Sequence, residues 1–144
     1  MIRLRNLCKN KIVVMSVDQT LWPFTLEYVS NRDRLYGPAT VDHVYKSREA
    51  LDFLKNNGCS IHLASTTSNT KKTLDLIDYY YGDFYFHSLV FDPSYHKLRH
   101  LELIIPGQEK NFVMFDSNLK TLNKIARIYS NSVTCHSSAL HLLA

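Results

Sequence analysis

The stretch that decides the fold is Lys11-Ile-Val-Val-Met-Ser-Val-Asp-Gln-Thr-Leu-Trp-Pro-Phe24. Residues 11–17 are largely apolar, as expected of a strand that is buried on both faces of a parallel sheet. Ser16, Asp18 and Thr20 lie at the end of this strand and just beyond it. Because open α/β sheets bind ligands beyond the carboxyl ends of their strands, the same stretch predicts where a site lies.

Strand-like and helix-like segments alternate along the rest of the chain. The further predicted strands cover residues 60–64, 87–91, 111–115 and 132–135. The predicted helices cover residues 45–57, 69–82, 97–105 and 119–129, with a last helical turn within 137–144. Residues 22–40 show no clear period and contain turn signals. The alternation predicts one α/β domain over residues 1–144, Rossmann-like, with a mostly parallel sheet and helices on both faces.

The composition narrows the class of protein. The chain has 144 residues, of which 45% are hydrophobic and 21% charged, which suits one globular domain. It has no run of about 18 apolar residues, so we expect no membrane-spanning helix and no membrane partner. Its three cysteines are far apart and form no CxxC pair, which indicates neither a zinc ribbon nor a disulfide framework. We interpret Cys59 and Cys135 as small buried residues and expect a reducing compartment, the cytoplasm or the nucleus, of which we favour the cytoplasm.

The N-terminus is basic. Arg3, Arg5, Lys9 and Lys11 occur without an acid, in a segment that is too short and too polar for a secretory signal. A clipped mitochondrial presequence is the alternative to the interpretation that we favour, a basic arm over residues 1–10 that runs straight into the first strand. The net charge of +4 and the pI near 9.0 favour encounters with anionic partners, although only slightly.

Polar residues follow the predicted strands in a recognisable order. They are Ser16-Val-Asp-Gln-Thr-Leu-Trp-Pro-Phe24, Ala64-Ser-Thr-Thr-Ser68, Lys97 and Asp116-Ser-Asn118. This order resembles the four motifs of the haloacid dehalogenase (HAD) superfamily. The string Thr20-Leu-Trp-Pro23 is similar to the first motif of the small eukaryotic magnesium-dependent phosphatases, Asp-x-Asp-x-Thr-Leu-Trp-Pro. The resemblance covers nearly the whole chain and implies a HAD fold with a minimal cap.

The resemblance also implies a role for each matching position. In that family the first Asp attacks phosphorus, the second protonates the leaving group, a Ser or Thr and a Lys hold the phosphoryl oxygens, and the last acidic pair anchors magnesium. The general acid position is thus Asp18. The anion-binding positions are Thr20, Ser65 and Lys97, and the metal positions are Asp116 and Ser117. Two positions depart from the family, because Ser16 replaces the nucleophilic Asp and Ser117 replaces an acid.

These two serines argue against catalysis. A hydroxyl at neutral pH is a poor nucleophile without an adjacent base, and the phosphate ester that Ser16 would form hydrolyses slowly. Magnesium prefers anionic oxygens, and each lost charge at about 4 Å is worth roughly 4 kcal/mol before desolvation. We therefore expect an inactive pseudophosphatase with vestigial Ser16, Asp18, Ser65 and Lys97, and no cofactor beyond weak Mg²⁺ binding.

Several of these residues also have a purely structural interpretation. Asp18 is expected either to act in the site or only to shape the loop. Thr20 and Ser65 are expected to bond backbone groups, Trp22 and Phe24 to pack beneath the site, and Lys97 either to bind an anion or to lie in solvent. His96, Lys97 and His100 have helical spacing but no third spaced ligand, so we favour surface histidines over a metal site. The aromatic residues of 79–86 are expected to be core and rim, with stacking on a partner as the alternative.

The partner is predicted from charge alone. Lys120, Lys124 and Arg127 share one helical face. The nucleic-acid candidates are these three together with Arg3, Arg5, Lys9, Lys11, Lys71 and Lys72. They favour docking on RNA or a ribonucleoprotein such as the ribosome, with a solvated helix face as the alternative. A residual magnesium-dependent phosphatase or phosphotransferase, and a protein–protein interaction module that uses residues 24–42, stay open as other functions. The oligomeric state stays open too.

Overall fold

The computed structural model describes residues 2–92, 101 and 111–144, with side chains from residue 4 onward. Its strands are β1 (Ile12–Met15), β2 (Ser60–Ser65), β3 (Ser88–Phe91), β4 (Phe112–Asp116) and β5 (Val133–His136). Its helices are α1 (Ile2–Leu7), α2 (Arg32–Tyr36), α3 (Pro38–Asn56), α4 (Thr70–Tyr81) and α6 (Leu119–Ile128), with 3₁₀ turns η1 (Leu26–Tyr28) and η2 (Ser137–Leu143).

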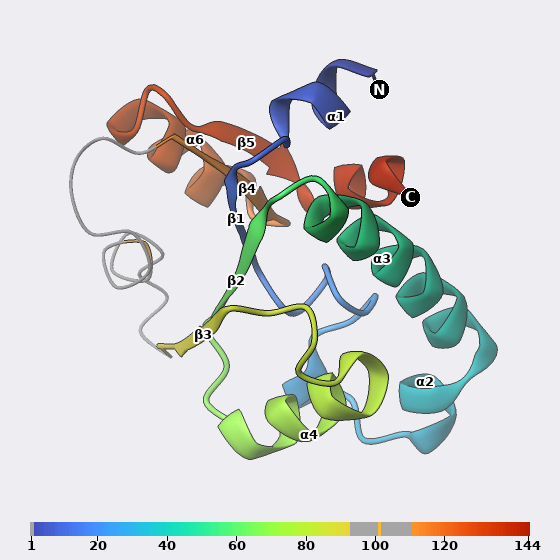
Figure 1. Ribbon diagram of the computed structural model, residues 1–144. Coiled ribbons are helices and arrows are strands. Elements are labelled where there is room, and N and C mark those ends of the chain that lie inside the picture. The colour runs from blue at the N-terminus through green and yellow to red at the C-terminus, as the bar shows by residue number, and fades with distance from the viewer. Residues whose placement is uncertain (1, 93–100, 102–110) are drawn as a thin grey trace.

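All five strands form one parallel sheet in the order β3-β2-β1-β4-β5 (Figure 1). The central strand β1 pairs with β2 and β4, so that Met15 lies between Leu63 and Phe115. The parallel sheet and its flanking helices confirm the predicted α/β, Rossmann-like fold class. The crossovers from β1 to β2, from β2 to β3 and from β4 to β5, which parallel pairing requires, are made by α3, α4 and α6.

The sheet has a hydrophobic core on each face. Val13 and Met15 of β1 point to one face, where they pack with residues of α3, α4 and η2. Val14 points to the other face and packs with Leu122 and Ile125 of α6 and with Leu101. Because neighbouring residues of a strand point to opposite faces, the continuous apolar run of β1 serves both cores. Helices therefore cover both faces, as predicted (Figure 1).

The helix α3 is longer than its sequence pattern indicates. It begins at Pro38 instead of residue 45. Pro38 is tolerated in the first turn because backbone N–H groups there have no acceptor within the helix, so the missing N–H of proline costs no hydrogen bond. Thr40 and Ser47 are buried on its inner face beside Val44. Because Thr40, in the part before residue 45, carries a hydroxyl on the buried face, apolar periodicity underestimates the start of the helix. The short helices α2 and η1 were also not predicted, within a segment that shows no period.

The N-terminal segment is a helix and not the predicted arm that runs straight into the first strand. Leu4 of α1 packs against the core, and Cys8 after it is completely buried. The guanidinium of Arg5 donates a hydrogen bond to the carbonyl of Ala144 at 3.1 Å and lies over the ring of Phe53. The segment is thus anchored by apolar contacts, which a count of basic residues does not reveal.

The remaining elements agree closely with the prediction. The helices α4 and α6 and the turn η2 occur where they were expected. The predicted helix at 97–105 lies outside the described residues except for Leu101, which is helical and buried. Cys59 is buried as expected, whereas Cys135 is only partly so. Across the described part of the chain, every helix is too short or too polar to span a bilayer.

Candidate functional site

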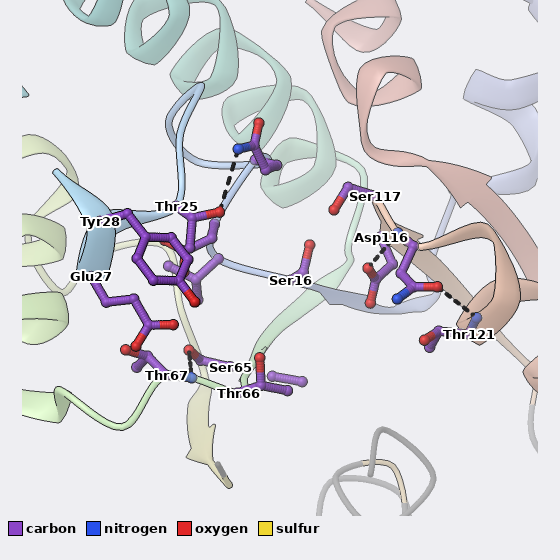
Figure 2. A pocket seen from close by; sticks show the side chains of 15 residues that line it. Ser16, Thr25, Glu27, Tyr28, Ser65, Thr66, Thr67, Asp116, Ser117 and Thr121 are labelled. Atoms are coloured by element: carbon purple, nitrogen blue, oxygen red, sulfur yellow. Dashed lines mark hydrogen bonds between the residues drawn. The ribbon is translucent and has the colours of Figure 1, made fainter. Parts of the chain in front are cut away.

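The sheet has a topological switch point between β1 and β4. The chain proceeds from β1 through β2 to β3 on one side and then returns to the other side of β1. Crossovers diverge at such a point, which leaves a crevice at the carboxyl ends of the two strands. A pocket of about 330 Å³ lies there, which we call the switch-point pocket (Figure 2). It is lined by Ser16, Val17, Asp18, Gln19, Thr25, Glu27, Tyr28, Ala64, Ser65, Thr66, Thr67, Asp116, Ser117, Asn118 and Thr121.

Ser16 occupies the position directly after β1. Its backbone N–H donates to the carbonyl of Phe115 at 3.0 Å, which extends the pairing of β1 with β4 by one residue. The residue is 7% exposed, and its hydroxyl forms a 2.6 Å hydrogen bond with the hydroxyl of Thr20. Thr20 is 1% exposed and does not line the pocket. The structure therefore places Thr20 behind Ser16, away from the position where it would touch an anion.

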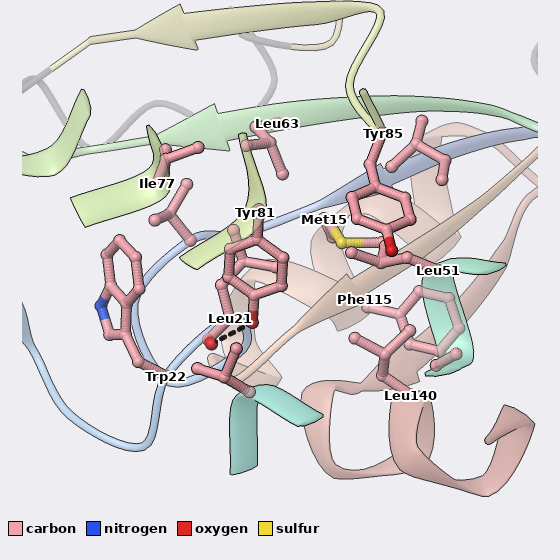
Figure 3. Close-up of a cluster of buried hydrophobic side chains, with 14 of the residues drawn as sticks. Met15, Leu21, Trp22, Leu51, Leu63, Ile77, Tyr81, Tyr85, Phe115 and Leu140 are labelled. Atoms are coloured by element: carbon pink, nitrogen blue, oxygen red, sulfur yellow. Dashed lines mark hydrogen bonds between the residues drawn. The ribbon is translucent and has the colours of Figure 1, made fainter. Parts of the chain in front are cut away.

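Asp18 both lines the pocket and holds the loop that follows β1. One carboxylate oxygen, Oδ1, accepts hydrogen bonds from the indole N–H of Trp22 at 2.8 Å and from the backbone N–H of Leu26 at 3.1 Å. Trp22 is completely buried, next to Leu21, whose carbonyl accepts from the Tyr81 hydroxyl (Figure 3). The buried indole thus fixes the orientation of the carboxylate, as expected of packing beneath a site.

A lysine fixes the far side of the same loop. The ammonium of Lys72 in α4 donates to the carbonyls of Val29 at 2.7 Å and Leu26 at 3.2 Å. The turn η1 is therefore tied to α4 and to Asp18, and it presents Glu27 and Tyr28 at the pocket (Figure 2). Neither residue was predicted to belong to the site. They follow no strand, and only the three-dimensional path of the loop brings them there.

The other predicted pocket residues come from β2 and β4. The Ser65 hydroxyl accepts from the N–H of Thr67 at 3.2 Å, as its structural interpretation expected. The carboxylate of Asp116 is buried, and its Oδ1 accepts from the N–H of Asn118 at 3.0 Å. The side chain of Asn118 in turn caps α6. The structure thus brings Ser16, Asp18, Ser65, Asp116 and Ser117 to one pocket.

The described residues allow the predicted metal positions to be assessed, whereas the predicted anion-binding Lys97 lies outside them. Within the described ranges, no three His, Cys, Asp or Glu side chains are grouped in a way that could hold a metal ion. Ser16 and Ser117 contribute neutral hydroxyls where the resemblance implies carboxylates, so these residues do not fit a resident Mg²⁺ ion. His96, Lys97 and His100 lie outside the described residues.

The predicted basic residues do not form one surface. Lys71 forms an ion pair with Asp75 at 2.8 Å. The ammonium of Lys72 donates hydrogen bonds to the carbonyls of Leu26 and Val29. Arg5 binds the C-terminal residue, Lys9 is exposed and Lys11 is half-buried, while the side chain of Arg3 lies outside the described set. In contrast, Lys120, Lys124 and Arg127 are all exposed on α6, and none of them forms an ion pair with another described residue.

A second hollow adjoins the switch-point pocket. It has a volume of about 470 Å³, and we call it the histidine cavity. It is lined by Gln19, Pro23, His43, Ser117, His136, Ser137, Ser138 and His141. Gln19 and Ser117 line both hollows, which are therefore neighbours. The sequence gives no signal for this cavity, because its three histidines lie in α3, in β5 and in η2 and share no spacing.

Two of these histidines, His43 and His141, lie in ring-to-ring contact. The rings of His43 and His141 are 4.4 Å apart. The Nε2 atom of His43 lies 2.9 Å from the carbonyl oxygen of Thr20, and Nε2 of His141 lies 2.8 Å from the hydroxyl of Ser47. Burial lowers the pKa of both imidazoles, and the proximity of His43 lowers that of His141 further. Both rings are therefore expected to be neutral at pH 7.

Comparison with known proteins gives no family for this chain. No protein-family model matches its sequence, and no curated protein matches it either.

Proposed function

We propose that this chain is a catalytically inactive, phosphatase-like protein that acts by binding. The resemblance of its motifs to the HAD phosphatases supplies the phosphatase part of the proposal. The hydrogen bond between the hydroxyls of Ser16 and Thr20 is the observation that carries the inactive part. A serine nucleophile needs an adjacent base, and the partner of Ser16 is another neutral hydroxyl in a buried position.

Activity against para-nitrophenyl phosphate with Mg²⁺ tests this proposal. We expect no turnover by the wild-type protein. The double variant Ser16→Asp/Ser117→Asp is expected to restore magnesium-dependent hydrolysis, since it returns the nucleophile and the second metal carboxylate that the resemblance implies. The single variant Ser117→Asp is the matched control, because it returns only the metal carboxylate. Wild-type turnover that disappears in Asp18→Asn would contradict the proposal and favour a residual phosphatase or phosphotransferase.

For the partner, we propose RNA or a ribonucleoprotein that contacts α6. The exposed Lys120, Lys124 and Arg127 support this proposal, because none of them forms an ion pair with a described acid. Phosphate contacts release counterions, so affinity for RNA should fall as salt rises, with a slope that grows by about 0.7–0.9 per contacted phosphate.

Binding of a structured RNA between 50 and 200 mM salt tests the role of α6. Changing Lys120, Lys124 and Arg127 together to Gln should weaken binding and reduce the slope by about 2–3 if each side chain contacts one phosphate. Lys71→Gln is the matched control, since Lys71 is exposed but paired with Asp75. A slope that is unchanged in the triple variant would exclude α6. Partner capture that survives nuclease treatment would favour the protein–protein interaction module instead.

A further inference from the structure

The histidine cavity combines ring nitrogens with hydroxyl groups. Its walls come from α3, from the loop after β1, from the end of β4 and from the β5–η2 corner. The described lining contains Ser117, Ser137 and Ser138, the amide of Gln19 and three imidazoles, and it contains no Asp or Glu. The switch-point pocket next to it is lined by three carboxylates, those of Asp18, Glu27 and Asp116. The two hollows therefore differ in the ligand charge that they favour.

The hydrogen bonds assign the protons on these rings. A carbonyl only accepts, so Nε2 of His43 carries the proton that it donates to Thr20. The Ser47 hydroxyl donates to the same carbonyl at 3.4 Å, so its oxygen accepts from Nε2–H of His141. In both neutral rings Nδ1 is then the atom that can take up a second proton. His136 differs, because its Nδ1 accepts from the N–H of Ser138 at 3.2 Å and its Nε2 is a donor already.

This arrangement argues against a cation. A metal ion would need converging lone pairs, and the described histidines, cysteines and acids form no such group of three or more. An anion instead needs donors, and the cavity offers Nε2–H of His136, the amide of Gln19 and the hydroxyls of Ser117 and Ser137. The Ser138 hydroxyl is not counted, because it donates to Nδ1 of His136 at 2.9 Å. Protonation at Nδ1 would turn His43 and His141 into charged donors as well.

We propose that the histidine cavity binds a small tetrahedral oxyanion of the phosphate or sulfate type. Such an ion accepts from several donors at once, and its charge compensates for protonated imidazoles. The proposal does not depend on the phosphatase-like function, because it uses residues outside the switch-point pocket apart from the shared Gln19 and Ser117.

Proton uptake should accompany binding. The charged groups that act on the histidine pair are Asp42 and Lys46 of α3, which pair with each other at 3.5 Å, and the two rings act on one another. In the absence of an anion these rings resist protonation, for the reasons given above. A bound dianion favours the protonated rings, so its affinity should rise as the pH falls through the pKa range of the pair.

Calorimetric titration with sulfate tests the proposal, since the charge of sulfate is constant between pH 5.5 and 8. We expect binding at least about tenfold tighter at pH 5.5 than at pH 8, as linkage to one proton allows up to tenfold per pH unit. The variants His43→Gln and His141→Gln keep a side-chain N–H donor but cannot be protonated. Each should lose most of the gain at pH 5.5, and urea unfolding of each variant verifies that it is folded.

Two controls locate the ion. His62→Gln removes a half-buried histidine of β2, and Ser65→Ala alters the switch-point pocket, so both should leave sulfate binding unchanged. Equal affinity at both pH values, or full affinity in both His43→Gln and His141→Gln, would overturn the proposal. Loss of binding in Ser65→Ala that matches the loss in the histidine variants would also overturn it, because the ion would then lie in the other pocket.

Discussion

The two neighbouring hollows share one edge of the sheet but are built differently. The switch-point pocket is lined by a loop that a buried indole, a carboxylate and a lysine hold in place. The histidine cavity lies between α3 and η2, and its key groups are rings that bond to Thr20 and Ser47. The shape of the first hollow thus depends on the loop after β1, whereas the charge of the second depends on the protonation of two histidines.

The largest effect on stability is expected for Trp22→Ala, which alters the loop that shapes the switch-point pocket and not the histidine pair. This change removes a completely buried ring and should lower the free energy of unfolding by about 3–5 kcal/mol. Trp22→Phe keeps an aromatic ring but removes the donor to Asp18, and it should cost about 1–3 kcal/mol. Urea unfolding measures both. A Trp22→Phe variant as stable as the wild type would show that the indole–carboxylate bond does not hold the loop.

A smaller effect is expected for Lys72→Met. Methionine keeps most of the apolar stem and loses the ammonium that binds the carbonyls of Leu26 and Val29, at a cost of about 1.5–3 kcal/mol. Lys71→Met is the matched control, since Lys71 forms only an exposed pair with Asp75 and should change stability very little. Equal effects of the two changes would show that the hydrogen bonds from Lys72 to η1 and Val29 do not stabilise the protein.

The smallest effect concerns pH and the histidine cavity. The folded-state pKa of His43 and of His141 lies below the unfolded value of about 6.5, so the unfolded chain binds more protons than the folded chain near that pH. Stability from these groups is complete above pH 6.5 and is lost as the pH falls through the lowered values. The melting temperature should fall between pH 7 and pH 5. The double variant His43→Gln/His141→Gln should show a shallower fall, and an equally steep one would assign the effect to other groups.

The sequence predicted most of the fold because its apolar pattern is strong where packing is strong. The run of β1 and the helices α4 and α6 show the expected periods, and the switch-point residues Ser16, Asp18 and Asp116 follow from their places after strands. The first part of α3 was missed because Thr40, on its buried face, is polar. Glu27 and Tyr28 were missed because a loop without a period brings them to the pocket. The histidine cavity was missed because its residues meet only after folding.

The burial of Cys8 makes its thiol a chemical probe of local unfolding. Its thiol is completely inaccessible, and burial raises its pKa to about 12, so the reactive thiolate is almost absent in the folded state. An alkylating reagent should therefore modify Cys8 only when the segment that contains α1 detaches from the core. The alkylation rate, followed by mass spectrometry, would report how often that happens under native conditions.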